Sequence, residues 1–103
     1  MKNILFIVLL MPLSVFAEDY TVRIKDHQFD PAELTIPAGT KIRLLVVNQD
    51  PTPEEFESYT LNREKVIAGN GKAVLFIGPL APGRYTFFGE FNPKTAQGAI
   101  IAK

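Results

Sequence analysis

Short runs in which apolar and polar residues alternate dominate the chain from residue 18 onward. Tyr20, Val22 and Ile24 occupy every second position of the first run, residues 20–25, so they share one face of an extended segment. Similar β-branched and aromatic runs, bounded by Pro, Gly, Asn or Asp, follow at residues 33–36, 41–47, 56–61, 72–77, 84–88 and 97–102. No later stretch keeps the apolar period of about 3.6 residues that marks a helix. The pattern predicts an all-β sandwich of about seven strands.

The segments between these runs carry turn-forming residues. Pro-Ala-Gly-Thr at 37–40 predicts a tight turn, and Gly-Asn-Gly at 69–71 predicts a hairpin turn. We expect the runs 72–77 and 84–88 to pair with each other through residues 78–83. Residues 48–54 hold two acids and two prolines, which favours an exposed loop. Residues 63–68 are expected to cross over without forming a strand.

The first seventeen residues differ from the rest of the chain. Lys2 precedes a nearly pure apolar run at residues 4–13, and Val15 and Ala17 are the small residues that a signal peptidase requires before its cleavage site. The alternative is a membrane anchor, but the run is shorter than the roughly 20 residues that a spanning helix needs. A lipoprotein anchor is excluded because the chain has no cysteine. We predict a signal peptide at 1–17, one domain at 18–103 and a periplasmic location.

Charge and cysteine content narrow the functional classes. Without Lys2, the 11 basic side chains become ten against 11 acidic ones. This near-balance gives no electrostatic case for binding nucleic acid or an anionic membrane. No disulfide can form, so stability must come from the apolar core, with or without a bound ion.

Two segments resemble a known family. The stretch Pro-Gly-Arg-Tyr-Thr-Phe-Phe-Gly-Glu-Phe-Asn-Pro at 82–93 is similar to the metal-binding end of the cupredoxins, and residues 36–42, leading to Asn48, are similar to an earlier strand entry of that fold. The resemblance implies a cupredoxin-like Greek-key β-sandwich. It places the family's thiolate ligand at Gly89, the following histidine at Asn92, the upstream histidine near Glu55 or Glu57, and the methionine near Ala96 or Gln97. A type-1 copper centre needs a cysteine thiolate and two imidazoles, so blue-copper electron transfer is excluded.

A narrower resemblance concerns residues 55–66 together with Phe-Phe-Gly-Glu-Phe at 87–91. These are similar to the cysteine-free cupredoxins of bacterial iron uptake, including the amino-terminal domain of EfeO-type proteins. The resemblance implies binding of an iron or copper ion and assistance in oxidising Fe(II). It also implies an inner-membrane iron permease and a periplasmic iron-binding protein as partners. In that subfamily the last Phe is usually followed by His, whereas this chain has Asn92.

Several oxygen and nitrogen donors are candidate metal ligands. Glu55 and Glu57 lie two apart in an extended segment, so they share a face and can bind one hard cation. Tyr59 continues that face. The alternative is an ordinary solvated strand surface.

His27 is the only histidine, and Glu90 lies in the loop that binds metal in the family. The alternatives are an uninvolved surface histidine and a glutamate paired with a lysine. Glu64 lies between Arg63 and Lys65, so we expect it to form a surface ion pair. The predicted metal ligands are therefore His27, Glu55, Glu57 and Glu90.

This donor set suits Fe(II)/Fe(III) or Cu(II) better than Cu(I). The sequence therefore favours a periplasmic metal-binding protein that supports ferrous iron uptake. One alternative is a copper carrier, which would use Met and His clusters, but Met1 and Met11 both lie in the predicted signal peptide. Another is a sandwich that has lost its metal and serves only as a docking or assembly module. No Ser/His/Asp spacing or phosphate-binding loop supports hydrolysis.

Overall fold

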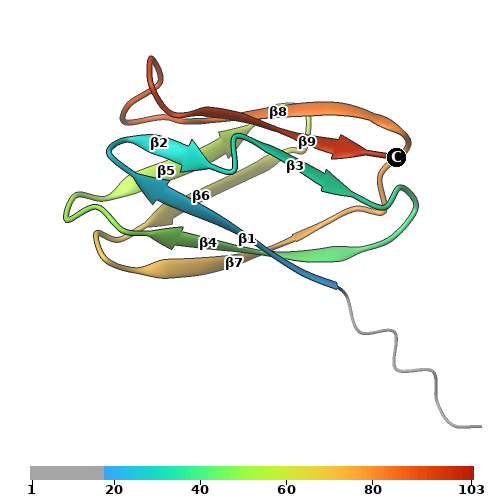
Figure 1. The fold of residues 1–103 in the computed structure, drawn as a ribbon, viewed down its shortest axis with the longest axis horizontal. Coiled ribbons are helices and arrows are strands. Elements are labelled where there is room, and N and C mark those ends of the chain that lie inside the picture. Colours follow the sequence, from blue (N-terminus) through green and yellow to red (C-terminus); the bar gives the residue numbers. More distant parts are fainter. Residues whose placement is uncertain (1–17) are drawn as a thin grey trace, which may run out of the picture.

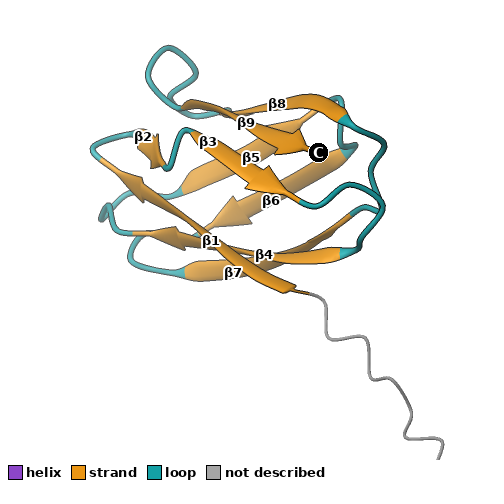
Figure 2. Ribbon diagram, turned by 45° about the vertical axis from the view of Figure 1, so that its right-hand side comes forward, coloured by secondary structure: helices purple, strands orange, loops and turns teal. Residues whose placement is uncertain are grey.

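The computed structural model describes residues 18–103, so the predicted signal peptide at 1–17 lies outside the described residues. Nine strands form two facing sheets, and residues 18–103 contain no helix (Figures 1 and 2). The first sheet has the order β2-β1-β4-β7, and the second has the order β3-β9-β8-β5-β6. The strands are β1 (Glu18–Lys25), β2 (Gln28–Asp30), β3 (Glu33–Ile36), β4 (Ile42–Asn48), β5 (Glu54–Ser58), β6 (Arg63–Ile67), β7 (Lys72–Ile77), β8 (Gly83–Gly89) and β9 (Gln97–Ala102).

Each sheet contains one parallel pair among antiparallel ones. β1 runs parallel to β4, and β3 runs parallel to β9. The all-β sandwich prediction is confirmed, but the strands number nine rather than about seven within the described part of the chain. The two additional strands are β2, which has only three residues, and β6. The sequence hides β6 because it lies at a sheet edge, where four of its five side chains are exposed and apolar alternation is lost.

The predicted pairing of residues 72–77 with 84–88 is wrong. β7 pairs with β4 in one sheet, whereas β8 pairs with β5 and β9 in the other. Residues 78–83 therefore cross from sheet to sheet. The turn at 69–71 forms, with the Gly71 amide donating to the Ala68 carbonyl at 2.9 Å, but it also joins strands of different sheets rather than a hairpin. Alternation specifies which face of a strand is buried, and does not specify its neighbour.

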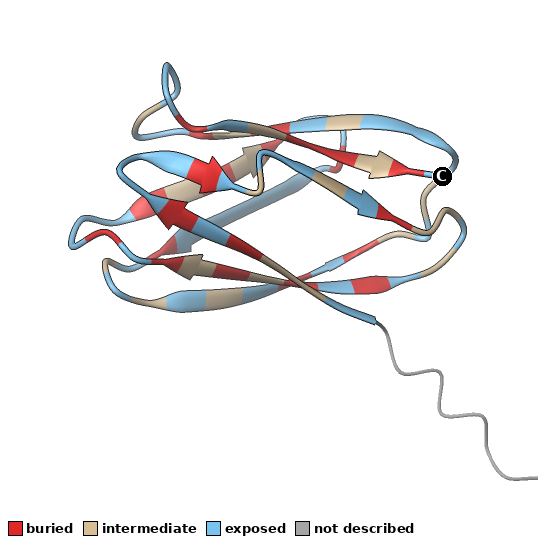
Figure 3. Ribbon diagram, in the orientation of Figure 1, coloured by how far each residue is buried: buried red, intermediate tan, exposed pale blue. Residues whose placement is uncertain are grey.

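The core lies between the sheets, where inward positions alternate with exposed ones (Figure 3). In β4, Ile42, Leu44 and Val46 are fully buried. Three aromatic rings from both sheets meet in the core: Phe29 and Phe87 contact edge to face at 4.9 Å between centroids, and Phe56 stacks on Phe87 at 4.8 Å. Such packing adds to the stabilisation from apolar burial alone.

The connection between β4 and β5 is mostly exposed, as its composition predicts: of its five residues, 49 and 51–53 are exposed. Three polar side chains in and beside it are nevertheless buried. Asn48, Asp50 and Glu54 are buried, with exposed fractions of 1%, 7% and 1%. The Asn48 side-chain amide donates to the Thr52 carbonyl at 2.8 Å, and its oxygen accepts the Asp50 amide at 3.0 Å. These polar groups are buried because hydrogen bonds replace their contacts with water.

Residues 18–103 include no helix that is long and apolar enough to cross a membrane.

Candidate functional site

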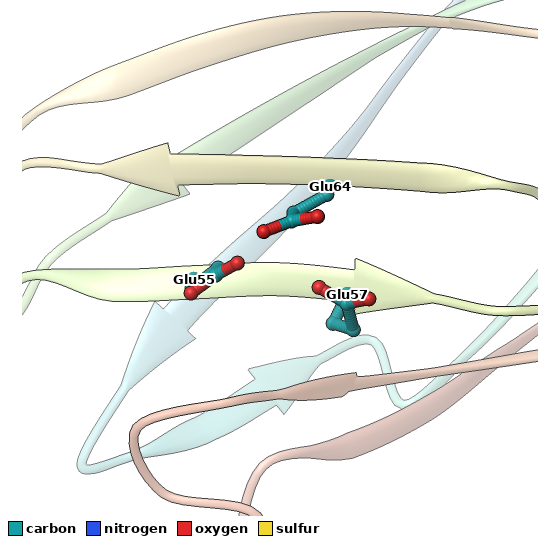
Figure 4. A group of neighbouring side chains, drawn as sticks. All are labelled: Glu55, Glu57 and Glu64. Atoms are coloured by element: carbon teal, nitrogen blue, oxygen red, sulfur yellow. The ribbon is translucent and has the colours of Figure 1, made fainter.

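Three glutamates gather on the outer face of the second sheet (Figure 4). Glu55 and Glu57 point outward from β5 because Phe56 between them is buried in the core. The antiparallel partner β6 places Glu64 directly opposite Glu57. One carboxylate oxygen from each of the three lies within 4.8 Å of the others. We call Glu55, Glu57 and Glu64 the acidic triad.

The triad is electrostatically unfavourable as it stands. The pKa of Glu55 is raised to about 7, first by hydrogen bonding with Glu64, then by partial burial and by the charges of Glu64, Glu57 and Glu90. Partial burial, followed by the charges of Glu64 and Glu90, also raises the pKa of Glu57, against a hydrogen bond with Glu55 that lowers it. None of the three ion pairs found within residues 18–103 involves these four glutamates. A cation would relieve this repulsion.

Glu64 therefore does not form the surface ion pair that its flanking cations suggest. Lys65 lies opposite Phe56 and so faces the other side of the strand from Glu64. The Arg63 guanidinium is bonded elsewhere, since its Nε donates to the Phe76 carbonyl at 3.0 Å. Neighbours in sequence point to opposite faces of a strand, which separates these charges.

Glu90 lies near the triad. Its backbone amide donates to the Glu55 carbonyl at 2.9 Å, and its side chain is exposed. Its charge reaches Glu55 and Glu57, as the pKa values of both show. Tyr59 is 78% exposed, and its ring packs 5.5 Å from that of Phe88.

His27 lies in the turn between β1 and β2, and it is not among the residues whose ligand atoms come together in the triad. Its φ is 57°, and its backbone amide donates to the Asp50 carboxylate at 2.9 Å. The Asp26 amide donates to the same carboxylate at 2.8 Å, and His27 Nδ1 lies 3.5 Å from it. The His27 amide bond is the main cause that lowers the pKa of Asp50, against the effect of burial. Asp50 thus fixes the left-handed backbone of this turn.

The inward face of β5 carries a carboxylate that the sequence analysis did not single out. Glu54 Oε1 accepts the backbone amides of Glu55 at 3.0 Å and Phe91 at 2.9 Å. Its Oε2 accepts the Asn92 side-chain amide at 2.8 Å. The predicted strand began at residue 56; beginning it at 54 would have placed Glu54 on the buried face with Phe56 and Ser58.

Glu54 lies where the family's ligand positions converge. A Cβ atom added at Gly89, the thiolate position, would lie 2.6 Å from Glu54 Cδ and 2.7 Å from Ala96 Cβ. Asn92, at the following histidine position, is bonded to the same carboxylate. The residues present therefore do not fit a type-1 copper ion: cysteine is absent, and the Glu54 carboxylate fills the space in front of Gly89.

This β-sandwich, with one parallel strand pair in each sheet, is similar to known proteins in sequence and in structure. Residues 4–102 match the sequence profile of the cupredoxin-like domain family. The chain belongs to this family. Its sequence is 39% identical over 115 residues to the uncharacterized protein RP394 of Rickettsia prowazekii (strain Madrid E), covering 97% of this chain and 92% of the relative.

Solved structures share the fold of this cupredoxin-like domain at low sequence identity. Auracyanin A, a "blue" copper protein of Chloroflexus aurantiacus, is 14% identical with a TM-score of 0.72, covering 85% of this chain and all of that one. Amicyanin of Paracoccus versutus is 21% identical with a TM-score of 0.66, covering 87% and 86%. The metal-binding domain of the Streptococcus pneumoniae Cu(I)-exporting P-type ATPase CopA, solved with Cu(I), is 16% identical with a TM-score of 0.69, covering 82% and 84%.

Proposed function

We propose that this cupredoxin-like domain binds one transition-metal ion on the outer face of β5 and β6, through the acidic triad and with Glu90 nearby. The observation that carries the proposal is the approach of three carboxylates to within 4.8 Å of one another, with no cation paired to them in residues 18–103. An ion centred among oxygens at that spacing would lie about 2.8 Å from each. Small side-chain rotations would then give oxygen–metal distances of about 2.0–2.6 Å.

The chemistry of the donors selects among metals. An all-carboxylate set suits hard cations, a class that includes Fe(III), and disfavours Cu(I), which prefers sulfur. Anionic oxygens stabilise the ferric state over the ferrous one. The proposed role is to support ferrous iron uptake in the periplasm, after removal of residues 1–17, beside an inner-membrane iron permease and a periplasmic iron-binding protein. The proposed site does not include His27, which is not among the residues whose ligand atoms come together.

Titrating the protein from residue 18 onward with Fe(II) under anaerobic conditions, and separately with Cu(II), tests the proposal. Isothermal calorimetry should give one site per chain. Glu57→Gln with Glu64→Gln should weaken binding by at least about 100-fold, since even residues outside the ligand shell cost 10–100-fold. Glu18→Gln with Glu33→Gln is the matched control, because it removes two carboxylates away from the triad. Equal weakening in both variants would contradict the site.

The pH dependence of metal affinity gives a second test of the proposed site. A metal that binds at Glu55 displaces the proton held there up to about pH 7. The apparent affinity should therefore rise about fivefold from pH 6 to pH 7 in the wild type, and much less in Glu55→Gln.

The second candidate function is a metal-free docking or assembly module. It is favoured by Glu54 and Asn92, whose mutual hydrogen bond occupies the ligand positions. Heats of titration and melting temperatures that do not change with either metal would favour this function over metal binding.

A further inference from the structure

We propose that the Glu54 carboxylate organises the loop end of this sandwich from within, in the place where the family's ligand positions converge, so that the loop between β8 and β9 is formed without any ion. The proposal concerns the inward face of β5 and does not rest on metal binding by the outward acidic triad. It is carried by the burial of Glu54, by its hydrogen-bond partners and by the space in front of Gly89.

The Glu54 carboxylate receives three hydrogen bonds, and all of them run in the same direction. All three partners of Glu54 are donors, so its carboxylate acts only as an acceptor. Two of them, the Phe91 backbone amide and the Asn92 side chain, belong to the β8–β9 loop and lie more than 35 residues away in sequence. No buried side-chain N or O atom within residues 18–103 lacks a partner. The carboxylate thus supplies the acceptor for both donors of this part-buried loop, and removing it would leave them without that partner.

The Glu54 carboxylate is in close contact with Gly89, which also lies close to Ala96. The distance of 2.6 Å from a Cβ added at Gly89 to Glu54 Cδ leaves no room for a larger side chain at residue 89. Ala96 is fully buried on the other side, and its carbonyl accepts the Gly89 amide at 2.9 Å. The Ala96 amide in turn donates to the Asn92 carbonyl at 2.9 Å, which closes the loop on itself. The three positions around Glu54 therefore form one packed, hydrogen-bonded unit.

The residues at positions 89, 92 and 96 are each compatible with a buried carboxylate acceptor at residue 54. Glycine at 89 makes space for the carboxylate, and Asn92 supplies a neutral donor to it. The buried alanine at 96 adds no polar group that would compete. All three positions therefore suit an acceptor that the chain itself provides.

Amide hydrogen exchange of the chain from residue 18 onward tests the proposal. The readout is the exchange rate of the Phe91 and Asn92 amides relative to the Leu44 and Val46 amides in β4, which corrects for global stability. In Glu54→Ala this ratio should rise about tenfold or more. In Glu54→Gln it should stay close to wild type, because the Gln carbonyl can accept the two backbone amides. The matched control Glu57→Ala changes the same residue type on the outward face of β5 and should leave the ratio unchanged.

The wild type is also measured before and after exhaustive chelation with EDTA. The exchange ratio should not change on chelation. It should also equal the wild-type ratio in Glu57→Gln with Glu64→Gln, so this test does not depend on whether the acidic triad binds metal. An unchanged ratio in Glu54→Ala would overturn the proposal. A ratio in the wild type that rises on chelation would also overturn it, because an ion would then be holding the loop.

Discussion

A single methyl group added at Gly89 measures how tightly Glu54 fills its site. Gly89 does not have a positive φ, so Gly→Ala would by itself stabilise the domain by about 0.4–1 kcal/mol through the unfolded chain. The new Cβ, however, would lie 2.6 Å from Glu54 Cδ and 2.7 Å from Ala96 Cβ. Overpacking of this kind costs about 1–3 kcal/mol. Displacing the carboxylate also weakens three hydrogen bonds worth about 1 kcal/mol each.

The expected loss for Gly89→Ala is therefore about 2–4 kcal/mol. For a domain of 86 residues (103 less the 17 of the predicted signal peptide), this corresponds to a fall in melting temperature of roughly 10–25 °C. Gly83→Ala, in the same strand, is the control. Its added Cβ would meet nothing closer than 3.6 Å, and its effect should stay within about 0.5 kcal/mol.

A double-mutant cycle isolates the contact. In the Glu54→Ala background the carboxylate is gone and only the close approach to Ala96 Cβ remains, so Gly89→Ala should destabilise the domain by about 1 kcal/mol. The coupling energy between the two positions should be about 2 kcal/mol, measured by urea unfolding followed by far-ultraviolet circular dichroism. A coupling energy below about 0.5 kcal/mol would refute the reasoning, because the two positions would then not share one space.

Two further predictions concern titration. The unfolded chain releases the Glu55 proton near pH 4.5 and the folded protein holds it to about pH 7, so stability should fall as pH rises through this window. Melting temperatures from pH 5 to pH 8 should show this decline in the wild type and a flatter profile in Glu55→Gln; parallel profiles would contradict it. Asn48→Asp places a buried carboxylate against the carbonyls of Thr52, Ile67 and Ala68, and should cost about 3–5 kcal/mol at pH 8. Asn48→Ala should lower the free energy of unfolding by about 2–3 kcal/mol at any pH. When urea unfolding is measured at pH 8 and at pH 4.5, only Asn48→Asp should therefore regain stability at the lower pH.

Part of the candidate site followed from sequence alone. The two-residue spacing of Glu55 and Glu57 around an apolar Phe56 places both on one outward face, as the structure confirms. Glu64 could be predicted only by knowing that residues 63–67 form a strand antiparallel to β5, and the charges flanking it pointed to an ion pair instead. The position of Asp50 beneath the His27 turn had no local signal, since 23 residues separate the two.

In β1 and β4, the alternation of side chains determined which residues are buried, because successive side chains of a strand point to opposite faces whatever its partner. Composition determined the absence of a thiolate. Only the tertiary structure decided that β7 and β8 belong to different sheets, and that the carboxylate of residue 54 meets residues 89, 92 and 96. Such meetings depend on the order of strands across two sheets, which is set by the packing of the whole core and leaves no periodic mark in the chain.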